Sequence, residues 1–244
     1  MLREALTYPL QSDHRLKTIG IGGALQFSAG IILTVGALFS VGVFVLVALI
    51  SLSLTAVFWG YYLRVLRTTA TEKTTLPVFD DWKELGVNGV KFFAITIGYL
   101  SVPIVLIFTE VIFLTGDGGT MTETGATVYI VARLLTFVIV FFVPVGWTNY
   151  ALTNQLREAF AVRDIVGAAL TRSYVKTVLL SLPLWFCYRL IQLFQAFVSG
   201  PGAYILYLAI ASVVSFYLLI VIFSLLGRGC GPHLREVEGE EVSD

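Results

Sequence analysis

The sequence carries little charge for its length. Only 13% of its 244 residues are Asp, Glu, Lys or Arg, whereas soluble domains carry about 25%. Sixteen basic residues balance sixteen acidic ones, so no surplus of positive charge favours a nucleic-acid partner. Hydrophobic residues make up 57% of the chain. This composition excludes an ordinary soluble domain and favours a membrane protein.

Cysteine and histidine are also scarce. Cys187 and Cys230 have no CxxC spacing, and His14 and His233 lie in opposite terminal segments. These positions argue against a disulfide framework and a zinc site. Neither histidine forms a recognisable catalytic pattern with a Ser, Cys or Thr, so nucleophilic catalysis has no candidate residues. We therefore expect no metal, no cofactor, no catalytic residues and no enzymatic activity.

Long apolar runs are present instead. A segment of about 20 apolar residues is needed to cross a membrane, and it must be helical to satisfy its own backbone groups. The chain contains no charged residue from 18 to 62, which is enough for two such helices joined by a turn. The six expected spans are 18–39, 41–66, 92–114, 126–152, 174–198 and 203–226.

The spans predict the fold class and domain organisation. We expect an all-α integral membrane protein with six transmembrane helices and short cytoplasmic amphipathic helices. Residues 1–244 should form a single polytopic membrane domain in contact with the lipid bilayer. Within it, residues 1–17 should lie at the membrane interface, and residues 227–244 should form an acidic cytoplasmic tail.

The basic residues are distributed unevenly between the two sides of the membrane. Six spans place both termini on one side, together with the connections after the second and fourth spans, and these segments contain Lys and Arg. The three connections on the opposite side contain neither. By the positive-inside rule, we expect a cell-membrane protein with cytoplasmic N- and C-termini.

A polar stretch, LPVFDDWKELGVNGVK at 76–91, interrupts the apolar runs. Pro77 opposes helix continuation, and either Asp80 or Asp81 can cap a following helix. Asp81 and Glu84 have the spacing of a capping box. The stretch therefore predicts the start of a helix.

Apolar residues in this stretch recur at helical spacing, beginning with Phe79 and Trp82. The pattern predicts a short helix lying flat on the cytoplasmic interface, with Trp82 at the level of the lipid headgroups. A weaker amphipathic pattern follows at 157–174.

The two amphipathic stretches raise the question of an internal repeat. Phe79 matches Phe160, and with a slip of one residue LSVP at 100–103 matches LSLP at 180–183. One explanation is a parallel duplication about an axis along the membrane normal. The other is coincidence within a restricted alphabet, because proline is frequent in spans. Both explanations stay open at this point.

Ionisable residues within the spans suggest a site. Glu110 and Arg189 follow the two matching prolines by similar distances, and Arg133 can reach a similar depth. A charge in the hydrocarbon core costs roughly 2.5–3.5 kcal/mol, so we expect these groups to pair in a buried cluster with Gln192 nearby. The cluster is either an ion-pair network that fixes helix register or a polar cavity whose surplus arginine binds an anion or a lipid headgroup.

The sequence YYLRVLRTT, followed by LPVFDDW and NGVKF, resembles an archaeal family of six-span membrane proteins, domain of unknown function 4013, which is common in haloarchaea. A more distant similarity in layout is to the membrane domain attached to some glycerophosphodiester phosphodiesterases. The resemblance implies a six-span fold and a haloarchaeal lineage. It implies no catalytic residue and no substrate.

Two functions remain as hypotheses. The first is a non-catalytic membrane protein that binds or transports a small anionic or lipid-like molecule in an outer-leaflet polar cavity near Arg189. The alternative is an accessory or scaffold subunit that docks a protein partner at the cytoplasmic face. In that case the docking residues would be Phe79, Asp80, Asp81 and Trp82.

Overall fold

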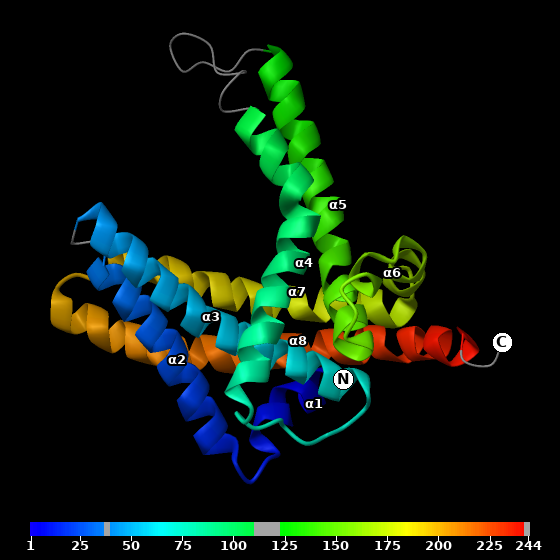
Figure 1. Ribbon diagram of the computed structural model, residues 1–244, viewed down its shortest axis with the longest axis horizontal. Helices are drawn as coiled ribbons and strands as arrows, with labels where there is room; N and C mark the ends of the chain where they lie inside the picture. The colour runs from blue at the N-terminus through cyan, green and yellow to red at the C-terminus, as the bar shows by residue number, and fades with distance from the viewer. Residues whose placement is uncertain (37–39, 110–122, 242–244) are drawn as a thin grey trace.

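The computed structural model describes residues 1–36, 40–109 and 123–241. Within these residues the regular structure is entirely helical, which confirms the predicted all-α class. The α-helices, shown in Figure 1, are α1 (Leu2–Thr7), α2 (Arg15–Gly36), α3 (Val41–Ala70), α4 (Trp82–Thr109), α5 (Glu123–Thr153), α6 (Val162–Ala169), α7 (Arg172–Phe194) and α8 (Pro201–Glu241).

Six of the helices, α2 to α5 with α7 and α8, are long and apolar enough to cross a membrane. The protein is therefore a multi-pass membrane protein, as predicted. α8 continues to Glu241, well beyond the predicted end of the last span at residue 226. The first part of this extension packs against the other helices through its glycines, which explains why the helix does not stop where the apolar run does.

One predicted element is wrong. The polar stretch does not form a separate helix lying flat on the interface, because α4 runs without a break from Trp82 to Thr109. Its amphipathic residues form the first turns of a span, and Leu85 and Gly89 among them pack against α3. A short amphipathic helix does occur in the second half, where α6 precedes α7 as a distinct element.

The helices approach most closely in what we call the basic half, the half that holds both termini and the connections 71–81 and 154–171. A methyl group added at Gly60 would lie 1.9 Å from the carbonyl oxygen of Leu85. One added at Gly89 would lie 1.7 Å from the carbonyl oxygen of Ala56. Only glycine permits this backbone contact between α3 and α4, as at close crossings in other membrane proteins.

Aromatic rings fill the space between the helices of the basic half. Trp59 of α3 stacks on Phe92 of α4 with ring centroids 4.6 Å apart, and Phe92 stacks on Trp147 of α5 at 4.5 Å. Phe223 of α8 completes the group at 5.6 Å from Trp147. Stacked rings from four spans therefore form the centre of the core.

The N-terminal segment packs on α8. Glu4 pairs with Arg228 at 3.1 Å, and Tyr217 donates a hydrogen bond to the backbone carbonyl of Leu6. Tyr8 is buried, and burial raises the pKa of its hydroxyl above the ordinary value. The neutral hydroxyl donates to the carbonyl of Thr75 at 3.2 Å, which ties the N-terminal segment to the connection before α4.

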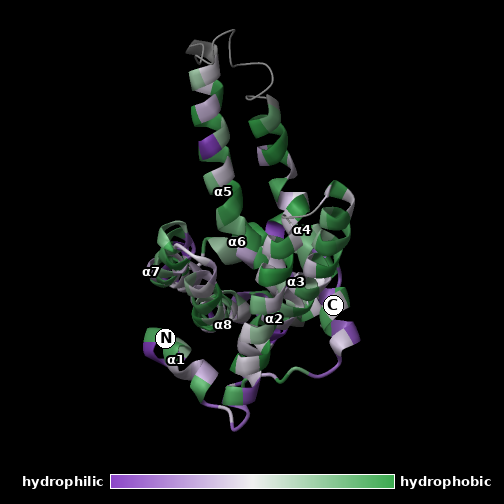
Figure 2. Ribbon diagram, turned by 90° about the vertical axis from the view of Figure 1, so that its left-hand side faces the viewer, coloured by the Kyte–Doolittle hydropathy of each residue, from purple (hydrophilic) through white to green (hydrophobic). Residues whose placement is uncertain are grey.

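The spans separate into two groups in the open half, the half that holds the C-terminal end of α2 and the connection between α7 and α8, although α2 and α3 stay close at Gly36 and Val47. In Figure 1 the distal parts of α4 and α5 form an arm that stands away from α2, α3, α7 and α8. Apolar residues predominate along this arm (Figure 2), and Phe108, Leu134 and Phe137 on it are exposed. These side chains are suited to contact with lipid.

Candidate functional site

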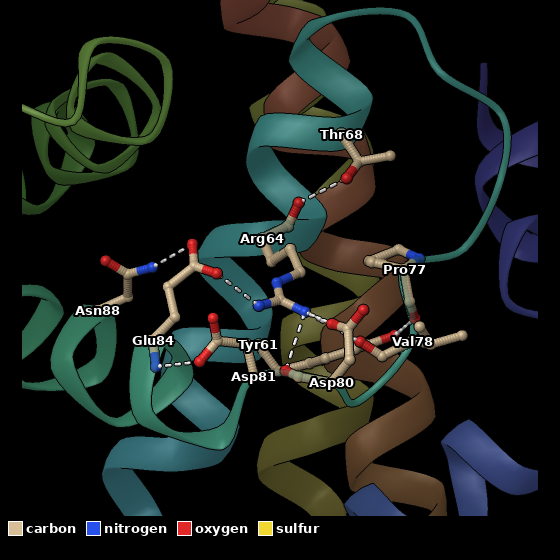
Figure 3. A network of polar contacts seen from close by, with 9 residues as sticks. All are labelled: Tyr61, Arg64, Thr68, Pro77, Val78, Asp80, Asp81, Glu84 and Asn88. Carbon is tan, nitrogen blue, oxygen red and sulfur yellow. Dashed lines mark hydrogen bonds and ion pairs between the residues drawn. The ribbon is translucent and has the colours of Figure 1, made fainter.

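The first polar region surrounds the FDDW segment, which comprises Phe79, Asp80, Asp81 and Trp82 at the start of α4. Figure 3 shows Asp80 and Asp81 with their polar neighbours. The Asp81 carboxylate accepts a hydrogen bond from the backbone N–H of Glu84 at 3.1 Å, so the predicted helix cap is confirmed. Asp81 has a φ of +45°, a left-handed conformation that aspartate tolerates better than most residues. This conformation turns the chain sharply into α4.

Arg64 of α3 holds the FDDW segment in place. Its guanidinium pairs with the carboxylate of Asp80 and, through Nη2, with Glu84 at 3.0 Å. It also donates to the backbone carbonyls of Val78 and Asp80. The Arg64 side chain is 17% exposed, whereas the carboxylates of Asp80 and Glu84 are 67% and 48% exposed. A largely buried cation therefore binds the connection from its inner side.

The network continues from α4 to α5. Asn88 donates to Glu84 at 3.4 Å and accepts from the hydroxyl of Tyr150 at 3.0 Å. Tyr150 has a second acceptor in Asn154 at 3.1 Å, and the ammonium of Lys91 lies 5.5 Å from its ring centroid. Together with Arg64, these groups connect α3, α4 and α5 at the basic side.

Two aromatic side chains of the FDDW segment differ in their contacts. Phe79 stacks on Tyr61 with centroids 4.2 Å apart, and the Tyr61 hydroxyl donates to the carbonyl of Pro77 at 2.9 Å. Trp82 lies beside Phe79 but is 48% exposed. Phe79 is therefore held by internal contacts, whereas half of Trp82 is available to a partner outside the chain.

The second polar region is a cavity of about 410 Å³ between α2, α3, α7 and α8, in the open half. α8 packs against the other three helices, whereas α7 has no extensive contact with α2 or α3 within the part of the chain that the structure describes. The space over α8 therefore stays open. Its polar lining includes Thr34, Gln192, Gln195, Tyr204, Tyr207 and Ser212.

Neutral hydrogen bonds connect the walls of this cavity. Gln195, directly after the end of α7, donates to the hydroxyl of Tyr204 on α8 at 2.7 Å, and that hydroxyl lies 3.3 Å from the hydroxyl of Thr34 on α2. Deeper in the cavity, Gln192 donates to Ser215 at 3.4 Å. Among the residues that the structure describes, no Asp, Glu, Lys or Arg lines the cavity. The site can therefore exchange hydrogen bonds but offers no charge.

Residues 43–199 of the chain match the family described as protein of unknown function DUF4013. The chain belongs to the DUF4013 family. This confirms the family expected from the FDDW segment and its surroundings. The chain matches no curated protein and no solved structure.

The matched region of this DUF4013 protein covers most of α3 and the whole of α4 to α7. It includes the FDDW segment and Arg64, together with the α3 and α7 walls of the cavity. The α2 and α8 walls lie outside the matched residues. Within 1–36, 40–109 and 123–241, no group of three or more His, Cys, Asp or Glu residues could hold a metal ion.

The structure places the predicted intramembrane cluster differently from the sequence expectation. Gln192 lines the cavity, whereas Arg189 is exposed on α7 and is not part of the lining. Arg133 is exposed on α5, where its guanidinium lies 4.8 Å from the ring centroid of Tyr129. Glu110 lies outside the described residues. The two arginines do not meet in a buried cluster, because the α4–α5 arm diverges from α7 (Figure 1).

Sequence reasoning missed most of the cavity lining. Three pairs of polar residues three positions apart mark one face of α8, or of α7 and the 3₁₀ turn Gln195–Phe197 that follows it. The pairs are Gln192 with Gln195, Tyr204 with Tyr207, and Ser212 with Ser215. Such spacing places both members of a pair on the same side of a helix. This spacing was the feature of the sequence that could have identified these lining residues, although it does not show which helices surround the cavity.

Proposed function

We propose that this DUF4013 protein is a non-catalytic membrane protein that binds a small lipid-like molecule in the cavity between α2, α3, α7 and α8. The observation that carries the proposal is the concentration of hydroxyl and amide groups around one open space among apolar spans. Polar groups inside a membrane are unfavourable unless they are hydrogen-bonded, and they commonly mark ligand pathways. Transport of the molecule would use the same cavity.

The dimensions and surroundings of the cavity suit such a ligand. Its volume of about 410 Å³ lies in the range of small-molecule sites, about 300–1,000 Å³. Leu33 lines the cavity and is also exposed, so an apolar chain has a surface to follow from the mouth into the lipid. A molecule with one polar and one apolar part would match both environments.

The proposed orientation in the cell follows from the distribution of basic residues. We infer that the basic half faces the cytoplasm of a cell-membrane protein and that both termini are cytoplasmic. The cavity then lies in the outer half of the bilayer. Its ligand would come from the outer leaflet or from the external solution.

The test is to identify what remains bound to the gently purified protein by native mass spectrometry. The wild type should retain a molecule in stoichiometric amount. Ala211→Phe, which fills the cavity from α8, should lose it, whereas Val214→Phe, a substitution at an exposed position of the same helix, should keep it. Gly30→Leu fills the cavity from α2 and provides a second variant if Ala211→Phe does not fold.

Retention of the molecule by folded cavity-filling variants would contradict the proposal. Unfolding midpoints close to that of Val214→Phe would establish that the filled variants are folded. A wild-type protein that carries no bound molecule, even when lipids are added back, would also contradict it.

The alternative function, docking of a protein partner, is favoured by a separate observation. Trp82 is half-exposed at the first residue of α4, beside the acidic side chains of the FDDW segment. A partner with an apolar pocket and basic residues would suit this surface. Trp82→Ala should then release a co-purifying partner, and association that is undiminished in this variant would refute the docking function.

A further inference from the structure

We infer that the group bound in the cavity is uncharged and carries several hydroxyls, as the headgroup of a glycolipid or a free polyol does. This inference rests on the proposed function and narrows it to a chemical class. It also differs from the anionic ligand suggested by the intramembrane arginines.

The lining argues against a charged group. A buried ion needs an opposite charge and several hydrogen bonds to offset the loss of water. No Arg or Lys among the described residues lines the cavity to receive an anion, and no Asp or Glu lines it to receive a cation. Arg189 is exposed on α7 and outside the lining, so an anion could meet its charge only at the rim of the cavity.

The hydrogen-bonding groups of the cavity match hydroxyls. Ser212 is only 8% exposed, lines the cavity, and makes no side-chain hydrogen bond with any described residue. The side-chain nitrogens of Gln192 and Gln195 donate to Ser215 and Tyr204, which leaves their carbonyl oxygens as acceptors. A hydroxyl both donates and accepts, so one kind of ligand group satisfies the serine and the two amides.

Aromatic rings complete the recognition surface. Trp59, Tyr188 and Tyr207 line the same space as the amides and Ser212. A polyol or a sugar has carbon-bound hydrogens that pack against ring faces while its hydroxyls reach polar groups. Sites of this composition, apolar and aromatic with a few fixed polar groups, are typical of small-molecule recognition.

The experiment compares headgroups on a constant chain. Protein purified in a polyoxyethylene detergent is titrated with octyl glucoside, octyl phosphate and octyltrimethylammonium, and also with glucose, which has no chain. The unfolding midpoint rises with any ligand that binds the folded state, so its dependence on concentration measures affinity. We expect octyl glucoside or glucose to give a saturable rise at concentrations at least tenfold lower than the two charged probes.

Variants locate the binding. Ser212→Val and Gln192→Leu should each weaken glucoside binding about tenfold, whereas Val214→Leu, at an exposed position of α8, should leave it unchanged. A rise with octyl glucoside alone assigns a lipid-like ligand. An equal rise with glucose assigns a free polyol. Both results support the inference.

Other results would overturn it. Preferential binding of octyl phosphate that is lost in Arg189→Gln would show an anion site at the rim, and preferential binding of the ammonium probe would show a cation site. Either result leaves the proposed function intact if Ala211→Phe abolishes the binding. The inference is also overturned if none of the probes gives a saturable rise. In that case native mass spectrometry of the molecule retained after purification still tests the proposed function separately.

Discussion

The basic half and the open half of the molecule differ in how closely their helices approach. In the basic half, α3 and α4 touch through Gly60 and Gly89, stacked rings fill the core, and Arg64 binds two carboxylates. In the open half α7 stands apart from α2 and α3 across a cavity with a neutral polar lining. Close packing leaves no space for a ligand, so the closest helix crossing and the cavity lie in different halves.

The largest expected effect lies where α3 crosses α4. In Gly89→Ala the new methyl group would meet the carbonyl oxygen of Ala56 at 1.7 Å, and because that oxygen belongs to the backbone, the helices must separate. We expect a loss of at least about 3 kcal/mol in the free energy of unfolding. Gly86→Ala has open space on the same helix and should gain up to about 1 kcal/mol. Equal unfolding midpoints in detergent would contradict the close crossing.

Two glycines of α2 allow the packing density of the two halves to be compared along one helix. In Gly22→Ala the methyl group would lie 2.0 Å from the fully buried ring of Phe216, and we expect a loss of about 1–3 kcal/mol. Gly30 faces the cavity, with its nearest neighbour 3.7 Å from the new methyl group. Gly30→Ala should therefore gain up to about 1 kcal/mol from helix propensity. Thermal unfolding of both variants tests this, and equal losses would mean that both halves are tightly packed.

Loss of the Arg64 cation should have a smaller effect. Arg64→Gln removes the ion pairs with Asp80 and Glu84, but both carboxylates are exposed enough to be hydrated. We expect a loss of about 1–2 kcal/mol. Amide hydrogen exchange should also accelerate in residues 76–84. Arg67→Gln, at an exposed position one turn further along α3, is the control. Similar exchange rates in both variants would show that Arg64 does not hold the connection.

The smallest effect is expected at the surface of the basic half. Glu72 pairs with Arg235, and the two side chains are 71% and 36% exposed. Glu72→Gln should therefore change the free energy of unfolding by at most about 1 kcal/mol. The difference from wild type should shrink as salt is added, because exposed charges are screened. Chemical unfolding of both proteins at low and high salt measures this difference. A large difference that does not change with salt would contradict the prediction, because it would mean that the pair is shielded from solvent.

Local patterns in the sequence determined the helices of this protein. Apolar runs of sufficient length predicted all six spans, because a backbone in lipid must satisfy its own hydrogen bonds. The Asp81 cap was also predictable from a local pattern, because the N–H that it binds lies only three residues away. The flat interfacial helix was wrongly predicted because the amphipathic pattern of the first turns of α4 describes packing against α3 equally well.

The tertiary structure decided which residues meet. Arg64 reaches Asp80 and Glu84 across a chain reversal, and the hydroxyls of Thr34 and Tyr204 come together from 170 positions apart. Arg133 and Arg189 have similar predicted depths but lie on diverging helices. In lipid, hydrophobicity drives helices into the membrane without choosing their neighbours, so small residues and side-chain shape select the pairs. The six spans follow from the sequence alone, whereas the neutral cavity between four of them exists only through that selection.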